Sequence, residues 1–198
     1  MPQHPLLNKP APTNLTLENQ NGEQVELSSI IGQGKPVVVF FYPKDESYGC
    51  VKEVCSFRDS YQIFQDAGAV VIGVSSDSAE AHKKFASAQN LQFTLLADVK
   101  NEAKKAFEVP KTLFVIPGRA TYLIDREGII REVFNSATDF AGHAKHAVDF
   151  VQKQQQASTG TDQNATAEEP VKSAEPVTAE EPVKSAEPVT SEEPAPKV

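Results

Sequence analysis

Two cysteines, Cys50 and Cys55, are the residues of this chain best suited to chemistry, and they lie close together in one segment. The run before them, residues 37–42 (VVVFFY), is apolar and typical of a buried strand. A turn that contains Pro and Gly follows, and residues 51–65 then have helical character. We therefore expect Cys50 near a helix N-terminus, where unpaired N–H groups and the positive end of the helix dipole stabilise a thiolate. The thiolate is the nucleophilic form of cysteine.

The spacing of the two cysteines limits the reactions that they can undergo together. Residues five apart on a continuous helix differ by about 140° of rotation and about 7.5 Å of rise, so they cannot form a disulfide without unwinding the helix. A static disulfide therefore fits poorly, and two inert buried thiols are the simpler alternative. A zinc site would need more ligands, because His82 stands alone and no second Cys pair accompanies His143 and His146. The preferred interpretation is a reactive thiol with a partner that it meets only after local unfolding.

These residues carry a resemblance to a known family. The pattern Pro43-x-x-x-Ser47-x-x-Cys50 resembles the Pro-x-x-x-Thr/Ser-x-x-Cys signature of peroxiredoxins, and residues 43–59 (PKDESYGCVKEVCSFRD) are similar to its peroxiredoxin Q, or bacterioferritin comigratory protein, branch. The chain departs from the common pattern in having Ser47 in place of Thr and Tyr48 in place of Pro. The resemblance covers about residues 5–150 and includes three further segments: 68–76 (GAVVIGVSS), 93–98 (FTLLAD) and 118–128 (GRATYLIDREG).

The resemblance implies that Cys50 is the peroxidatic cysteine and that Cys55, five residues later, is the resolving cysteine. Cys50 would attack a peroxide as a thiolate and become a sulfenic acid, which Cys55 would convert into an intramolecular disulfide. The implied substrates are hydrogen peroxide and alkyl hydroperoxides. A dithiol reductant similar to thioredoxin would restore the enzyme, and no metal, haem or flavin is implied.

Four other residues are candidates for this site. The Ser47 hydroxyl can hold a peroxide oxygen in line with the sulfur, although an ordinary helix N-cap is the alternative. Arg119 would stabilise both the thiolate and the departing oxygen, unless it is a surface arginine in a turn. Pro43 would shield the thiolate from water, or simply end the preceding strand. Glu53 would either stabilise the hydrogen-bond network around these residues or lie on a solvated helix face.

The remaining pattern predicts a thioredoxin-like α/β fold, with a central mixed sheet flanked by helices. Asn21-Gly22 lies between two polar, alternating stretches within residues 12–27 and predicts a hairpin. Strands at 37–42, 69–75 and 93–96 alternate with helical patterns at 50–67, 79–89 and 102–107, which favours parallel strands with crossover helices. A closing antiparallel hairpin (121–125 and 129–134) and a helix over about 139–154 complete the pattern, and residues 1–155 are expected to form one domain.

The last part of the chain has a different composition. Residues 168–179 (EEPVKSAEPVTA) recur almost unchanged at 180–191, and the stretch from Ala157 onward has nine acidic residues, three lysines, six prolines and no aromatic residue. Such a segment cannot bury enough apolar surface to offset its ordering entropy, so we predict a disordered acidic tail over residues 156–198. A docking arm for a basic partner is the functional alternative to a solubilising extension.

Composition also bears on partners and location. The part before the tail is not basic, which argues against nucleic acid, and no apolar run approaches the ~20 residues that span a bilayer. Residues 1–15 contain neither Arg nor an apolar stretch typical of a targeting signal, so a cytoplasmic location is expected. The protein is also expected to be a monomer. Two other functions stay open: a thioredoxin-fold disulfide oxidoreductase or redox sensor, which would lack its usual Cys-x-x-Cys, and a non-enzymatic protein that acts through its acidic tail.

Overall fold

The computed structural model describes residues 3–111 and 118–159 of the chain. The tail was predicted over residues 156–198, and from residue 160 onward it lies outside these described residues, so its predicted disorder is not tested there. Within the described residues the strands are β1 (Thr16–Asn19), β2 (Gln24–Glu26), β3 (Val37–Phe41), β4 (Val70–Ser75), β5 (Thr94–Ala97), β6 (Ala120–Ile124) and β7 (Ile130–Asn135). The helices are η1 (a 3-10 turn, Leu27–Ser29), α1 (Tyr48–Asp59), α2 (Tyr61–Asp66), α3 (Ala79–Gln89), α4 (Glu102–Ala106) and α5 (Phe140–Thr159).

The strands form one mixed sheet in the order β2-β1-β5-β4-β3-β6-β7. Its middle strands β3, β4 and β5 are parallel and are joined by crossover helices, as the alternation of patterns predicts. β6 lies antiparallel to β3, and β7 is antiparallel to β6. The predicted Asn21-Gly22 hairpin is confirmed as the antiparallel pair β1 and β2, with Gly22 at a φ of 83° that only glycine adopts readily. The sheet is therefore the mixed sheet expected of a thioredoxin-like fold.

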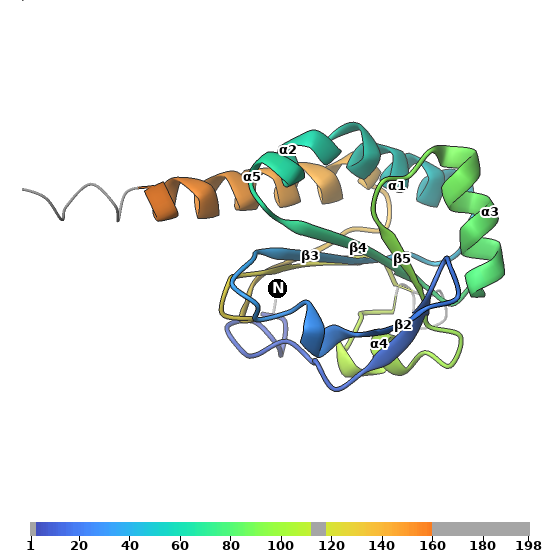
Figure 1. Cartoon of the computed structure of the whole chain (residues 1–198), viewed down its shortest axis with the longest axis horizontal. Coiled ribbons are helices and arrows are strands. Elements are labelled where there is room, and N and C mark those ends of the chain that lie inside the picture. The colour runs from blue at the N-terminus through green and yellow to red at the C-terminus, as the bar shows by residue number, and fades with distance from the viewer. Residues whose placement is uncertain (1–2, 112–117, 160–198) are drawn as a thin grey trace, which may run out of the picture. The chain divides into compact units, whose positions relative to one another are not determined.

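Helices cover both faces of the sheet, and β3 shows how the sequence divides between them. All five of its residues are buried because alternate side chains enter two different cores. Val38 and Phe40 pack with residues of α1, α2, α3 and α5, whereas Val37, Val39 and Phe41 pack with α4 and the N-terminal segment. Figure 1 shows these four helices on one side of the strands and α4 on the other.

Two predicted elements differ from the structure. The helix expected over residues 50–67 is two helices, because the backbone leaves helical geometry at Ser60 (φ −97°, ψ 4°) before α2 begins. The last helix runs to Thr159 rather than to about residue 154, so residues 156–159, predicted to belong to the disordered tail, are helical. The domain boundary at residue 155 stays a prediction. None of the helices in the described part of the chain combines the length and apolar character needed to cross a bilayer.

Candidate active site

Cys50 lies in the first turn of α1, as predicted. The loop after β3 ends at Ser47, which has an extended conformation (φ −73°, ψ 142°), and α1 then begins at Tyr48. The Cys50 thiol is completely buried, and both cysteines are free. Its backbone N–H is one of the donors of the first helical turn that have no partner within the helix, and the helix dipole adds positive potential there. Local structure alone therefore favours a thiolate at Cys50.

Arg119 adds a full positive charge at the same sulfur. It directly precedes β6, is 5% exposed, and its Nη2 donates a hydrogen bond to Cys50 Sγ at 3.2 Å. Its Nη1 donates a hydrogen bond to Glu53 Oε2, and its guanidinium lies 4.9 Å from the centre of the Phe140 ring. The surface-arginine alternative is therefore wrong. A buried guanidinium held on three sides is a preorganised cation for a thiolate or for an anion that develops beside it.

Gly49 makes this close packing possible. A Cβ atom at that position would lie 2.6 Å from the Phe140 ring of α5 and 3.3 Å from Arg119 Nη2. Any larger residue would push the ring and the guanidinium away from the start of α1. Gly49, which is predicted from the sequence to lie in a turn, lies in the first turn of α1 and is a packing requirement of the site.

Glu53 is fully buried on the inner face of α1, so the solvated-face alternative is also wrong. Burial raises the pKa of Glu53 to about 8, and the Arg119 guanidinium opposes this rise. His143 of α5 places Nδ1 3.4 Å from Glu53 Oε1 and 2.8 Å from Thr121 Oγ1. Burial lowers the pKa of His143 to about 4, so its imidazole is neutral near neutral pH. Its Nε2 then donates to the Ser136 carbonyl, and its Nδ1 accepts from the Thr121 hydroxyl.

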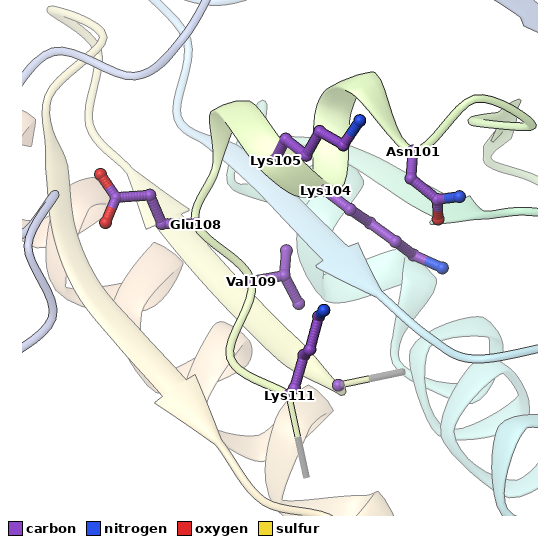
Figure 2. Close-up of a pocket in the computed structure, with 7 residues that line it drawn as sticks. Asn101, Lys104, Lys105, Glu108, Val109 and Lys111 are labelled. Carbon is purple, nitrogen blue, oxygen red and sulfur yellow. The ribbon is translucent and has the colours of Figure 1, made fainter. Parts of the chain in front are cut away.

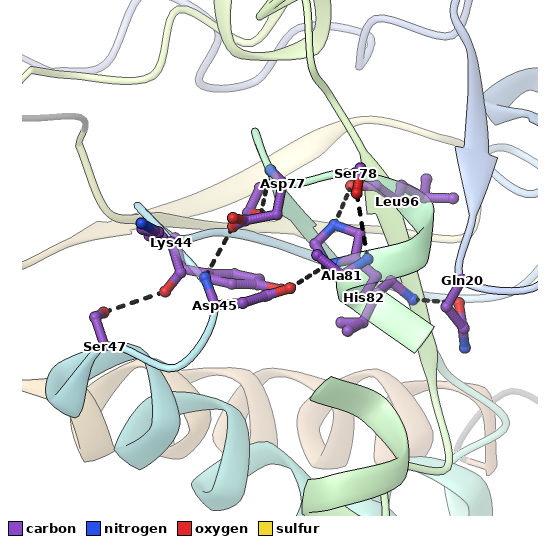
Figure 3. Close-up of polar contacts among 12 residues, drawn as sticks. Gln20, Lys44, Asp45, Ser47, Asp77, Ser78, Ala81, His82 and Leu96 are labelled. Carbon is purple, nitrogen blue, oxygen red and sulfur yellow. Dashed lines mark hydrogen bonds and ion pairs between the residues drawn. The ribbon is translucent and has the colours of Figure 1, made fainter. Parts of the chain in front are cut away.

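Ser47 and Pro43 lie on the loop that leads into α1. The Ser47 hydroxyl is exposed and donates to the carbonyl of Lys44 at 3.1 Å (Figure 3). It forms no side-chain cap on α1, so the N-cap alternative fails for its hydroxyl, although Ser47 occupies the N-cap position. Pro43 directly follows Tyr42 at the end of β3 and is half-buried. The structure thus groups Cys50, Arg119 and Glu53 at one point, and it places Ser47 and Pro43 in the loop before them.

Cys55 lies on the same helix, one and a half turns beyond Cys50. Its side chain is partly buried, and its Sγ lies 3.4 Å from Gln89 Oε1 at the end of α3. Both cysteines belong to the continuous helix Tyr48–Asp59, so the two sulfurs cannot bond while α1 is intact. The predicted requirement for local unfolding therefore holds in this structure.

A pocket lined by lysines lies next to Arg119, because Gly118, the preceding residue, is part of its lining. Figure 2 shows this pocket of about 520 Å³, whose described lining is Asn101, Lys104, Lys105, Glu108, Val109, Lys111 and Gly118. Lys104 donates to Ser76 Oγ at 2.7 Å. Burial lowers the pKa of Lys104, while the nearby Asp98, Asp77 and Cys50 oppose that shift. The pocket therefore has a positively charged wall within electrostatic reach of the thiol.

One polar group next to the site was not predicted from the sequence. Asp45 in the loop and His82 of α3 form a buried pair, with 2.8 Å between His82 Nδ1 and Asp45 Oδ2. No local pattern reveals this pair, because the two residues are 37 positions apart in the sequence. Within residues 3–111 and 118–159, no three His, Cys, Asp or Glu side chains converge as ligands for a metal ion.

Known proteins resemble this chain in sequence and in structure. Residues 7–133 match the AhpC/TSA family. The chloroplastic peroxiredoxin Q of Sedum lineare is 46% identical over 142 residues, covering 71% of this chain and 75% of that protein. The chloroplastic peroxiredoxin Q of Triticum aestivum is 44% identical over 142 residues, covering 71% of this chain and 64% of its own length. A solved structure of the Xanthomonas campestris bacterioferritin comigratory protein aligns with a TM-score of 0.66 at 28% identity, covering 72% of this chain and 93% of that one.

These similarities agree with the arrangement of Cys50, Arg119 and the first turn of α1. The chain therefore belongs to the AhpC/TSA family, and it is an oxidoreductase of the peroxiredoxin Q kind that acts as a thiol-dependent peroxidase.

Proposed function

We propose that this peroxidase reduces hydrogen peroxide and alkyl hydroperoxides with Cys50 as the attacking residue. The observation that carries the proposal is the hydrogen bond from Arg119 Nη2 to Cys50 Sγ at 3.2 Å, at the N-terminus of α1. Two sources of positive potential therefore meet at one sulfur. The Xanthomonas campestris relative is described by its alkyl peroxide reduction activity, which supports organic peroxides as substrates.

In the first step the Cys50 thiolate attacks the terminal oxygen of the peroxide. The S–O bond forms as the O–O bond breaks, and the electron pair of that bond leaves on the hydroxide or alkoxide. That anion takes up a proton to become water or an alcohol, and Cys50 becomes a sulfenic acid. Arg119 stabilises the thiolate before attack and the negative charge on the departing oxygen afterwards.

In the second step the Cys55 sulfur attacks the Cys50 sulfenic acid. A disulfide forms and the sulfenic oxygen leaves as water, which requires α1 to unwind between the two cysteines. A dithiol reductant similar to thioredoxin then reduces the disulfide and is itself oxidised to a disulfide. We assign Ser47 to orienting the peroxide oxygens and Pro43 to limiting access of water, because both lie in the loop before Cys50.

The experiment is a stopped-flow peroxide assay on the wild type, Cys50→Ser and Cys55→Ser, each supplied with a thioredoxin system. Cys50→Ser should lose the reaction entirely. Cys55→Ser should consume one peroxide per chain and then stop as a sulfenic acid or mixed disulfide, because no second thiol resolves it. If Cys50→Ser reacts with peroxide as fast as the wild type, the assignment of the two cysteines is wrong.

The same assay separates the other functions that the sequence leaves open. A protein disulfide oxidoreductase or redox sensor would oxidise or reduce protein thiols without rapid turnover of peroxide. A protein that acts only through its acidic tail would keep its binding activity in Cys50→Ser. A cytoplasmic location and a monomeric state are part of the proposal, and sedimentation of the purified chain would test the second.

A further inference from the structure

A buried cluster of polar side chains holds the loop between β3 and Cys50. We call it the Asp45 cluster; its members are Tyr42, Asp45, Ser75, Asp77 and His82. The Asp45 carboxylate accepts from the Tyr42 hydroxyl at 2.7 Å through Oδ1 and contacts His82 Nδ1 at 2.8 Å through Oδ2. The Asp45 backbone N–H donates to Asp77 Oδ2 at 2.8 Å (Figure 3). One loop residue is therefore fixed through its backbone and through both carboxylate oxygens.

The partners of Asp45 are themselves anchored to rigid elements of the fold. Asp77 Oδ2 also accepts from the hydroxyl of Ser75, the last residue of β4, at 2.7 Å. His82 of α3 places Nε2 3.2 Å from the carbonyl of Leu96 in β5. Tyr42 directly follows β3 and stacks on Phe40 with 5.8 Å between ring centres. The cluster thus connects the loop to the ends of three neighbouring parallel strands and to α3.

The side chains of the cluster also have hydrogen-bond partners within it. Both nitrogens of His82 face oxygen atoms, the Asp45 carboxylate and the Leu96 carbonyl. Burial and the adjacent Asp45 raise the pKa of Tyr42 well above its usual value, so its hydroxyl remains a donor. A buried network in which the polar groups are satisfied is rigid.

The Asp45 cluster is close enough to Cys50 in the sequence to affect the position of its thiol. Only residues 46–49 separate Asp45 from Cys50, and Glu46 has a φ of 61°, in the left-handed region that non-glycine residues rarely adopt. Such a conformation persists where the surrounding structure holds it in place. The Ser47 hydroxyl then bonds the carbonyl of Lys44, within the same loop.

We propose that Tyr42, Asp45 and His82 are positioning residues for peroxide attack: they fix the loop that sets the start of α1, and therefore the geometry of Cys50 and Ser47 against Arg119. The inference rests on the proposed function of Cys50. Because the cluster lies outside α1, it stays in place when α1 unwinds, so it should act on the peroxide reaction and not on reduction of the disulfide.

The central test compares two matched tyrosines. Tyr42→Phe removes only the hydroxyl that bonds Asp45, whereas Tyr122→Phe removes an equally buried hydroxyl that bonds the Phe107 carbonyl at 2.7 Å in the core on the other face of the sheet. Stopped-flow oxidation of Cys50 and reduction of the disulfide by dithiothreitol are measured separately for each variant. We expect Tyr42→Phe to slow oxidation about tenfold, with reduction unchanged, and Tyr122→Phe to leave both rates at the wild-type value.

Asp45→Asn extends the comparison, with an expected loss of about 10- to 100-fold in the oxidation rate. The double variant should be no slower than Asp45→Asn alone, because both substitutions release the same loop. Wild-type oxidation rates in Tyr42→Phe and Asp45→Asn would overturn the proposal. Equal slowing of both half-reactions, or loss of folding in Tyr42→Phe alone, would make the cluster a stability element and overturn it too. Failure of the wild type to react with peroxide would instead contradict the proposed function.

Discussion

At the scale of single residues, the proposed peroxide reaction depends on the contacts of Arg119. Its guanidinium contacts Cys50, Glu53 and the Phe140 ring, so its position is determined before any peroxide arrives. A cation that is already in place need not reorganise as negative charge develops on the leaving oxygen. Lysine would not replace it fully, because a single ammonium cannot bond Glu53 and Cys50 with the fixed geometry of a guanidinium.

Arg119→Ala should therefore slow oxidation of Cys50 by ~10²-fold or more, which is the effect of removing a preorganised donor. The ultraviolet absorbance of the thiolate at neutral pH should fall in the same variant. Arg119→Lys should have an oxidation rate and a thiolate absorbance between those of the wild type and of Arg119→Ala. Arg131→Ala is the matched control, because Arg131, which lies on β7, pairs with Asp125 rather than with the thiol. A wild-type rate and an unchanged thiolate signal in Arg119→Ala would remove Arg119 from the mechanism.

At the scale of elements, α1 has two opposing effects in the proposed mechanism: it activates Cys50, and it keeps Cys55 from reaching Cys50. Its first turn stabilises the Cys50 thiolate, yet its intact hydrogen bonds keep Cys50 and Cys55 apart. Firm contacts lie on both sides of the part that must unwind. The Asp45 cluster precedes it, and Phe57 stacks on Phe40 of β3 with 4.2 Å between ring centres. Unwinding should therefore be confined to the segment between these two contacts.

Oxidation to the intramolecular disulfide should remove amide protection between Tyr48 and Phe57 and leave β3 and α3 protected. Hydrogen exchange on reduced and oxidised protein measures this, with mass spectrometry to confirm the disulfide. The oxidised form would also lose the helix N-terminus that activates Cys50, so it should not bind peroxide. Equal protection of Tyr48–Phe57 in the two states, with the disulfide present, would show that the pair closes without unwinding α1.

At the scale of the whole molecule, two buried titratable groups should make stability depend on pH. Burial raises the pKa of Glu53 from 4.5 to about 8, so its contribution to stability is full below pH 4.5 and is lost as pH rises through about 8. Burial lowers the pKa of His143 from 6.5 to about 4, so its contribution is full above pH 6.5 and is lost as pH falls through about 4. The two effects oppose each other between pH 4.5 and 6.5.

The free energy of unfolding of the reduced protein should therefore fall between pH 6.5 and 8, by about 1.4 kcal/mol per pH unit from Glu53 alone. Glu53→Gln should remove this fall, whereas Glu132→Gln, which removes a half-exposed carboxylate beside His146, should keep it. Urea unfolding at a series of pH values measures the difference. Constant stability of the wild type over that range would mean that Glu53 stays ionised beside Arg119 at neutral pH.

Local patterns in the sequence were sufficient for most of the elements. The β1–β2 hairpin at Asn21-Gly22, the buried strand β3 and the helix start before Cys50 each depend on neighbours within a few residues, so their sequences predict them. The break at Ser60 was missed because no Pro or Gly stands between Val51 and Gln65, and the only local signal is Ser60 itself, a residue type common at helix N-caps. Arg119 was predicted only through the resemblance of the segment that contains it.

The tertiary structure alone decided which polar side chains surround the thiol. Arg119 reaches Cys50 across 69 positions of sequence, and Asp45 reaches His82 across 37, because β3 and β4 end, and the antiparallel strand β6 begins, at the same edge of the sheet. Glu53 is indistinguishable in sequence from an exposed helical glutamate. It is buried because α5 packs against that face of α1, and side-chain burial depends on which distant element covers a face. The sequence by itself therefore predicted the proposed nucleophile and its helix, while the packing of β6, α3 and α5 determined the charges and hydrogen bonds that surround it.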